Sequence, residues 1–378
     1  MKILISGGGM AGLLLAGLLE KKGIDVLLIE KSQSYDRVGF WIGLYPFSAN
    51  TLRDIGTYSS YVASSIPMEA YRMWDAEGAA LQTLSFKEIF DPIHGELRAL
   101  HRADLIDILR QGTRAPHRMG TSITNIHVRE DGVEAMLSSG EKCHADLLVA
   151  ADGIHSSVRA LAGIHTDLLD WGFTAFTWWM PTVAELQTTV QEYWGHGALF
   201  GLYPIREKTN AVAGIPTPHN LESMDQSAIK AHIRKALEGF PALPKAAIAA
   251  LEHEEVYAWK MMDHCAPQWI KSRIVLVGDA AAGFLPTAGV GASNALKSAQ
   301  VLADEIGRAD AQSLPQALSL WEQRVRHRVE ANHEASRRLA RMIFTRSDLF
   351  ASGRDFILKH LPMKVIADDV LASNINPW

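Results

Sequence analysis

Residues 1–30 read MKILISGGGMAGLLLAGLLEKKGIDVLLIE, and this stretch decides the fold. An apolar run over 3–5 leads into Gly7, Gly9 and Gly12 with the spacing G-x-G-x-x-G, which opens an apolar helix. A second apolar run follows over 26–29. Strand, glycine turn, helix and strand in this order predict a βαβ unit whose helix N-terminus faces an anion.

Each glycine of this motif has its own task in such a unit. Gly7 makes the tight turn, Gly9 lets the backbone approach a pyrophosphate, and Gly12 lets the helix pack on the strand. Glu30 stands eighteen residues after Gly12, where a carboxylate can bind both hydroxyls of an adenosine ribose. The N-terminal stretch therefore predicts dinucleotide binding.

Composition and charge narrow the class of protein. A chain of 378 residues is long enough for two domains or one large mixed domain. Its net charge of −5 does not indicate a nucleic-acid-binding surface. Cys143 and Cys265 are far apart, and the sequence has neither C-x-x-C nor H-E-x-x-H, so we expect no disulfide framework and no metal. No apolar stretch reaches the ~18 residues of a spanning helix. Lys2 leads straight into the first strand, so we expect a cytoplasmic protein without signal peptide or stable membrane insertion.

Strand patterns return twice after the N-terminal unit. Short alternating runs separated by turn residues fill 66–100, and strands dominate again over 170–262, as is typical of antiparallel sheets. Continuous apolar strands at 145–151 and 274–277 lie outside these parts, and a long helical region begins near 313. The sequence therefore predicts an α/β fold in which a nucleotide-binding layer is interleaved with a mainly antiparallel sheet.

Acidic turns follow both of these apolar strands. Asp152-Gly153 ends the first, and Gly278-Asp279 ends the second. An aspartate at a strand end is, on its own, more often a turn or cap than a ligand contact. The glycine-rich helix start at 289–292 adds free N–H groups and a partial positive charge, which would stabilise a bound negative charge.

Three motifs in this order resemble a known family. They are the glycine motif, DGIHSSVR at 152–159, and GDAAAGFLPTAGVGASNAL at 278–296. They are similar to those of the single-component flavin-dependent aromatic hydroxylases, the p-hydroxybenzoate-hydroxylase-like monooxygenases, and the resemblance covers nearly the whole chain. It implies bound FAD, NADPH or NADH as transient reductant, and O2. The activity implied is hydroxylation of an aromatic or polycyclic small molecule through a flavin C4a-hydroperoxide.

The resemblance also implies a Rossmann-like FAD-binding domain, a β-sheet substrate domain and a C-terminal helical region. We place the discontinuous FAD-binding domain at 1–65, 100–169 and 264–310. The substrate-binding β-sheet domain takes 66–99 and 170–263, and the C-terminal helical region takes 311–378.

The same resemblance assigns residues to FAD. Glu30 would bind the ribose, Arg102 would contact FAD from a helix start, Asp279 would hold the ribityl chain, and Pro286 would lie near the isoalloxazine edge. The Asp152 motif is implicated in binding both FAD and NADPH. The full set expected at the cofactor is Gly7, Gly9, Met10, Ala11, Gly12, Glu30, Lys31, Arg37, Gly43, Arg102, Ile123, Asp152, Gly153, Arg159, Gly278, Asp279, Pro286, Gly289, Val290, Gly291, Ala292 and Asn294.

Two positions depart from the family pattern. Ala282 stands where the family usually has a histidine, and Phe40-Trp41 places two bulky rings where it usually has small residues. These changes bear on flavin movement and on how NADPH reaches the flavin. Two alternatives stay open: an oxidase or reductase of the same fold without oxygen insertion, and a non-catalytic flavin- or ligand-binding homologue.

We expect the substrate between the flavin and the strand-rich layer. Alternation places Leu199 and Tyr203 on one strand face and Phe200 on the other, and does not select between the faces. Candidate polar catalytic residues are His196 and Arg206. Because no arginine clamp for a carboxylate is evident, we expect a bulky, largely apolar aromatic such as a polyketide or quinolone. The expected pocket residues are Phe176, Trp178, Trp179, Tyr193, Leu199 and Tyr203.

Overall fold

A six-stranded, mainly parallel sheet is built on the N-terminal βαβ unit. The computed structural model describes residues 1–35, 39–182 and 186–361. The strand order of this sheet is β18-β19-β12-β1-β2-β8. The carboxyl ends of β1, β12 and β19 therefore lie side by side, and a predicted turn follows each of them. The strands are β1 (Lys2–Ser6), β2 (Asp25–Ile29), β8 (His117–Arg118), β12 (Leu147–Ala150), β18 (Ile270–Lys271) and β19 (Ile274–Leu276).

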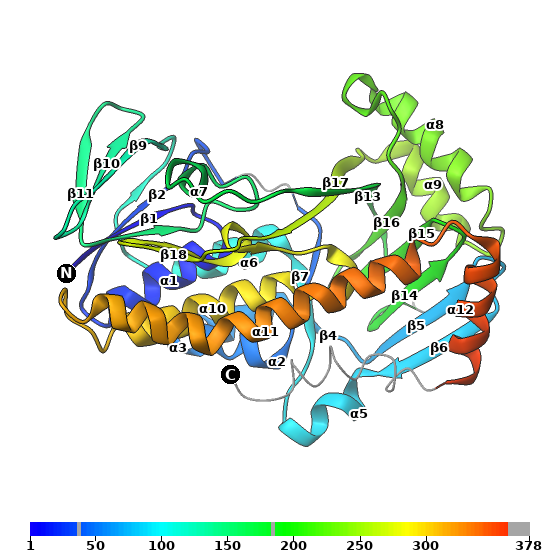
Figure 1. Cartoon of the computed structure of the whole chain (residues 1–378). Helices are drawn as coiled ribbons and strands as arrows, with labels where there is room; N and C mark the ends of the chain where they lie inside the picture. Colours follow the sequence, from blue (N-terminus) through cyan, green and yellow to red (C-terminus); the bar gives the residue numbers. More distant parts are fainter. Residues whose placement is uncertain (36–38, 183–185, 362–378) are drawn as a thin grey trace.

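Helices cover this sheet and bury their apolar residues against it or against one another. In α1 (Met10–Lys21) nine consecutive residues from Ala11 to Leu19 are buried, as expected for a helix that is apolar all round. α1 packs against α6 (Arg102–Gln111) and α10 (Gly291–Ile306), and the 30-residue α11 (Leu314–Ile343) packs against α10. A three-stranded antiparallel sheet, β9 (Ile123–Val128), β10 (Val133–Leu137) and β11 (Lys142–Ala145), lies at this end of the molecule (Figure 1).

An eight-stranded sheet forms the second layer, in the order β20-β17-β13-β16-β15-β14-β5-β6. Its pairs are antiparallel except β14 with β5. One face packs against α8 (Gln226–Leu237) and α9 (Lys245–His253), which Figure 1 shows beyond the sheet. The other face turns toward the end of α11. The strands are β5 (Ala70–Asp75), β6 (Ala80–Ser85), β13 (Leu169–Pro181), β14 (Thr189–Trp194), β15 (Leu199–Pro204), β16 (Lys208–Pro216), β17 (Tyr257–Cys265) and β20 (Ala282–Gly283).

A small antiparallel sheet, in the order β3-β7-β4, and several short helices complete the described chain. The sheet consists of β3 (Trp41–Leu44), β4 (Ile66–Pro67) and β7 (Arg98–His101). The α-helices are α2 (Pro46–Ala49), α3 (Thr51–Asp54), α4 (Tyr58–Ser64), α5 (Phe86–Phe90), α7 (Ser157–Leu161) and α12 (Asp348–His360). The 3-10 turns are η1 (Asp91–Ile93), η2 (Leu221–Ser223), η3 (Gly278–Ala280) and η4 (Pro286–Ala288).

This architecture confirms the predicted α/β class with an interleaved, mainly antiparallel sheet and C-terminal helices. The stretch over 66–100 differs in part, because α5 and η1 separate its strands. The sheets support the division at 1–65, 100–169 and 264–310 against 66–99 and 170–263, which we propose as the domain organisation. β20 and β4 are exceptions: β20 lies within 264–310 but extends the eight-stranded sheet, and β4 lies within 66–99 but belongs to the small sheet with β3 and β7. Among the described residues, no helix is long and apolar enough to span a bilayer.

Candidate cofactor and substrate site

A continuous cavity of about 1180 Å³ joins the two layers. One end lies at the carboxyl ends of β1 and β12, where Gly7, Gly9 and Asp152 line it. The other end lies against the eight-stranded sheet, where Tyr71 and Glu192 line it. Its volume exceeds the range of roughly 300–1,000 Å³ for single small-molecule sites, as expected for a cavity that takes a dinucleotide and a second molecule.

The glycine loop leaves an open cradle at the first end. A Cβ built on Gly7 would lie 2.3 Å from the Ala151 carbonyl oxygen, and one on Gly12 would lie 2.0 Å from the Gly7 oxygen, so the protein's own packing requires both glycines. A Cβ built on Gly9 meets nothing within 4 Å. Gly9 is also the N-cap of α1, without a side-chain cap or an acid in the first turn. Free N–H groups beside open space fit a pyrophosphate.

Glu30 lies beside this loop and lines the same cavity. Its carboxylate accepts hydrogen bonds from the backbone N–H groups of Gly8 at 2.7 Å and Ser32 at 2.9 Å. These two bonds fix the carboxylate at the end of β2 and leave it lone pairs for further donors. The arrangement fits the hydroxyls of a ribose.

Arg102 and Asp279 both line the cavity and attract each other electrostatically. Arg102 begins α6, whose N-cap is the His101 side chain, which accepts from the Ala103 N–H at 3.1 Å. Burial lowers the pKa of Arg102, while Asp279 and Glu30 oppose that shift. Asp279 is exposed toward the cavity, and the protein around its carboxyl group raises the pKa to about 6 by desolvation, against the pull of Arg102. One cation and two carboxylates thus face a space that can take hydroxyl and phosphate groups.

The raised pKa of Asp279 predicts a pH effect on the FAD-free protein. The folded-state pKa of about 6 lies above the unfolded value, so the proton is bound more tightly in the folded state. This contribution to stability is complete below about pH 4 and is lost as the pH rises through 6. We expect Asp279→Asn to flatten the fall in unfolding free energy between pH 4 and 7, measured by urea unfolding.

Asp131→Asn is the matched control for this experiment, because Asp131 is exposed in the turn between β9 and β10. It should leave the pH dependence as in the wild type. A wild-type slope in the Asp279→Asn protein would contradict the raised pKa of this carboxyl group.

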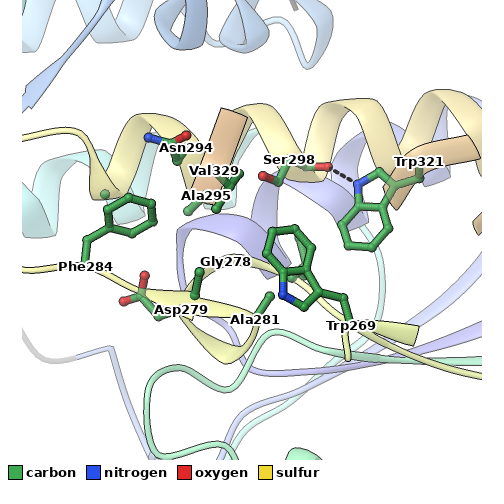
Figure 2. A pocket seen from close by; sticks show the side chains of 13 residues that line it. Trp269, Gly278, Asp279, Ala281, Phe284, Asn294, Ala295, Ser298, Trp321 and Val329 are labelled. Carbon is green, nitrogen blue, oxygen red and sulfur yellow. Dashed lines mark hydrogen bonds between the residues drawn. The ribbon is translucent and has the colours of Figure 1, made fainter. Parts of the chain in front are cut away.

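Large side chains support the turn that carries Asp279. Figure 2 shows Asp279 and Phe284 at one end of a void of about 10 Å³, with Trp269 and Trp321 at the other. The Trp321 indole N–H donates to the Ser298 carbonyl at 3.0 Å, and the two tryptophan rings lie 5.8 Å apart. A void of this size holds about one water. The turn that carries Asp279 is therefore supported by a closely packed part of the core.

Most of the residues expected at FAD gather around the cavity. A second set lies directly behind the lining, namely Ala11, Gly12, Gly278, Val290 and Asn294. Asn294, for example, donates to the Val290 carbonyl and accepts from Asn332. Arg37 lies outside the described residues. The cavity-lining set is Gly7, Gly9, Met10, Glu30, Lys31, Gly43, Arg102, Asp152, Gly153, Asp279, Pro286, Gly289, Gly291 and Ala292.

Two of the expected cofactor contacts need correction. Arg159 is buried away from the cavity lining, and its guanidinium donates to the carbonyls of Ile154 at 2.7 Å and Ala280 at 2.9 Å. It therefore ties the turn after β12 to the turn after β19. Ile123 lies in the core under the parallel sheet, while Thr121 and Ser122 line the cavity in its place.

Only one strand face of the expected substrate pocket reaches the cavity. Leu199 and Tyr203 line the cavity. Phe176, Trp178 and Tyr193 do not, because they point to the opposite face of the sheet and pack in the cluster with α8 and α9. There the Trp178 indole N–H donates to the Ala247 carbonyl at 2.9 Å. Periodicity defines two faces, but only tertiary packing decides which of them is the pocket.

Trp179, His196 and Arg206 also lie outside the cavity lining. The Trp179 ring packs against His101, with centroids 5.1 Å apart, beneath the Lys208 ammonium. His196 is exposed in the turn before β15 and lies 2.8 Å from the Asp348 carboxylate. Arg206 donates to the Ala63 carbonyl at 2.5 Å. We therefore assign none of these three residues to substrate.

The bulky pair Phe40-Trp41 forms cavity wall. Phe40 stacks on Trp259 with centroids 4.6 Å apart, and Trp41 lies 5.4 Å from the Tyr203 ring. The Trp41 indole N–H donates to the Pro204 carbonyl at 3.0 Å, so the ring is anchored to the eight-stranded sheet. This contact joins the two layers beside the cavity.

The fold and the cavity define a dinucleotide-binding protein with a second β layer over its cofactor site. The chain belongs to the family described as FAD binding domain, whose model matches residues 1–335. It is 29% identical over 320 residues to the 2-heptyl-3-hydroxy-4(1H)-quinolone synthase of Pseudomonas aeruginosa, covering 80% of both chains. It is also 29% identical over 356 residues to the 3-amino-4-hydroxybenzoate 2-monooxygenase of Streptomyces platensis, covering 89% of this chain and 87% of that one.

The fold matches that of HpxO from Klebsiella pneumoniae, solved with FAD and uric acid. The TM-score is 0.90 at 20% identity, over 99% of this chain and 97% of that chain. The predictions of FAD binding and of the hydroxylase family are therefore confirmed, and the chain is an FAD-dependent monooxygenase. Across the described ranges, no cluster of three or more His, Cys, Asp or Glu side chains could hold a metal ion.

Proposed function

We propose that this monooxygenase uses NAD(P)H and O2 to hydroxylate a bulky, mostly apolar aromatic or heteroaromatic molecule. The observation that carries the proposal is that one cavity connects the nucleotide cradle at Gly9 with an apolar chamber on the sheet. FAD, when bound, accepts hydride from the reductant and activates oxygen. The apolar lining at the sheet end consists of Leu84, Phe86, Leu97, Val190, Leu199, Val212, Met261, Met342, Ile343 and Phe344.

We assign the chain's own groups to three tasks. The N-terminus of α1 holds the pyrophosphate of FAD, and Glu30 holds the ribose. Arg102 and Asp279 hold the ribityl chain that leads to the ring system. The uncapped N-terminus of α10, which has no acid in its first turn, stabilises negative charge on the ring system. Phe40 and Trp41 exclude water and present a flat aromatic wall to a planar substrate.

Relatives and composition support the substrate class and the compartment that we propose. A quinolone synthase and an aminohydroxybenzoate monooxygenase are among the relatives, and the names of both denote ring compounds. The chamber is lined mainly by apolar side chains, which favours a larger and less polar ring system. Both cysteines are free, which supports the reducing cytoplasm, where NAD(P)H is available.

The test is product analysis on the FAD-loaded protein with NADPH or NADH under ¹⁸O₂. A panel of quinolones, naphthols and polycyclic phenols is expected to include at least one that gains one labelled oxygen atom. Nucleotide oxidation without labelled product from any member would favour an oxidase or reductase. A protein that oxidises no nucleotide with any ligand would favour a non-catalytic binding protein.

A further inference from the structure

A buried carboxylate lies in the wall of the apolar chamber. Glu192 is 6% exposed in the middle of β14, within the run TVQEYW, all six residues of which are buried. It lines the cavity on the same sheet face as Val190. Burying a charged group costs several kcal/mol unless hydrogen bonds compensate. A glutamate at this position therefore calls for a reason beyond packing.

Three hydrogen-bond donors surround this carboxylate. The Tyr203 hydroxyl donates to it at 2.6 Å, the Trp194 indole N–H at 2.8 Å, and the Tyr71 hydroxyl makes a shorter bond. Burial raises the pKa of Glu192, and the three donors oppose that shift. In its ionised form the carboxylate accepts from all three donors, and its negative charge can then take up a proton.

Neighbouring strands are shaped to build this cluster. Gly201 on β15 is the register partner of Glu192, and a Cβ on Gly201 would lie 2.4 Å from the Tyr203 ring. The missing side chain therefore lets the Tyr203 ring lie across β15 and reach Glu192. Tyr71 approaches from β5, which pairs with β14 on the other edge. Three adjacent strands thus bring one carboxylate and two phenols together.

Tyr71 and Tyr203 both line the cavity. Each directs its own proton to Glu192, so each oxygen keeps lone pairs that can accept a hydrogen bond from the cavity. Burial and the neighbouring Glu192 raise the pKa of both tyrosines well above the usual range, so they are neutral. Trp41, beside the expected cofactor, packs against Tyr203. The cluster therefore suits a ring that stacks on Trp41 and carries a hydrogen-bond donor.

We propose that Tyr71, Glu192 and Tyr203 form a proton-accepting site that selects aromatic substrates carrying a ring O–H or N–H. The substrate group donates to a tyrosine oxygen and transfers its proton there while the tyrosine proton moves to Glu192. One carboxylic acid forms, one substrate O–H or N–H bond breaks, and the electron pair stays on the ring. The ring becomes more electron-rich, as an acceptor of electrophilic oxygen must be. This inference rests on the proposed function for its substrate class.

The test compares probe pairs that differ only in the donor. The pairs are 2-naphthol with 2-methoxynaphthalene, and 4(1H)-quinolone with its 1-methyl derivative. They are titrated into the FAD-loaded protein without reductant, and affinity is read from the flavin spectrum and ionisation from the probe's own absorbance. The tyrosine oxygens are hydrogen-bonded to a carboxylate, so we expect each donor-bearing probe to bind roughly 10- to 100-fold more tightly than its methylated partner. Bound 2-naphthol should be partly ionised.

Glu192→Gln is expected to reduce the difference in affinity between a donor-bearing probe and its methylated partner to about threefold or less. It should also remove the absorbance band of ionised 2-naphthol. Tyr203→Phe should lower the ratio while leaving the fold intact. The matched control is Tyr193→Phe, on the same strand but facing α8 and α9, which should keep the wild-type ratio and band. The proposal is overturned if the wild type prefers no donor-bearing probe, or if Glu192→Gln keeps both the preference and the ionisation.

These binding readouts are independent of turnover. Donor selection that depends on Glu192, without any labelled product in the oxygen experiment, would leave the inference standing and reject the proposed function. Labelled product formed equally from a donor and its methylated partner would reject the inference alone.

Discussion

A Gly9→Asp variant is expected to fold normally and to purify without FAD. Gly9 has φ −77° and ψ −170°, which any residue adopts, and a Cβ built there meets no protein atom within 4 Å. An aspartate would cap α1 and place a negative charge at the N-terminus, stabilising the FAD-free protein by about 0.5–1 kcal/mol. The same carboxylate would occupy the cradle that we assign to the pyrophosphate.

The expected loss of affinity is large because like charges meet in an enclosed site. Two unit charges about 4 Å apart repel by about 4 kcal/mol near a protein surface, which is roughly a thousandfold in affinity. Flavin content follows from the ratio of absorbance at 450 and 280 nm in the purified protein. Reconstitution of stripped protein, followed by flavin fluorescence, gives the dissociation constant, and urea unfolding of the stripped protein gives its stability.

Gly9→Ala is the matched control, since it adds a methyl group without charge. We expect it to bind FAD more tightly than Gly9→Asp, and the difference measures the electrostatic part of the effect. A Gly9→Asp protein that purifies with full flavin occupancy would contradict our assignment of this cradle. An aspartate variant that loses FAD only because it unfolds would contradict the expectation that this variant folds normally.

The nucleotide end of the site was predictable because its determinants are local in sequence. Gly7, Gly9 and Gly12 act within one turn, and Glu30 ends the next strand of the same βαβ unit. Asp152 and Asp279 each follow an apolar strand, and the ends of parallel strands meet at one edge of a sheet. Spacing and strand order alone therefore bring these groups together.

The substrate end depends on non-local packing, and there the sequence was less informative. Alternation along β15 separates Leu199 and Tyr203 from Phe200, but α8 and α9 decide which face is core. Phe176 was assigned to the wrong face for this reason. Glu192 was missed because a single acid in an apolar strand has no spacing to mark it, and its partner Tyr71 lies 121 residues away.

Arg159 illustrates a different limit. Its motif was recognised, but a motif does not say where a long side chain points. The guanidinium turns inward to two carbonyls, so the residue positions the turns around the cofactor site without lining the cavity. This role becomes evident only in the folded structure, where β12 and β19 lie side by side.

Arg337→Ala is expected to destabilise the protein by about 3–5 kcal/mol, because it would leave a buried carboxylate without its cation. Asp263 on β17 is fully buried, and its two oxygens accept from Arg337 at 2.7 and 3.0 Å. His333 lies 3.5 Å away, but burial lowers the pKa of this imidazole, so Arg337 is the cation that holds the carboxylate in the intact protein. The pair also fixes α11, whose last turns carry the cavity-lining Met342.

Urea unfolding of FAD-stripped protein measures this cost, and two variants show its origin. Arg341→Ala, one turn further along α11, removes an arginine whose partner Glu334 is 45% exposed, and should change the unfolding free energy by no more than about 0.5 kcal/mol. In the double variant Asp263→Leu with Arg337→Leu, no buried charge is left behind, so at least half of the lost stability should return. If Arg337→Ala costs under about 1 kcal/mol, or if the double variant is as unstable as the single one, the Asp263–Arg337 pair does not anchor α11 to the sheet.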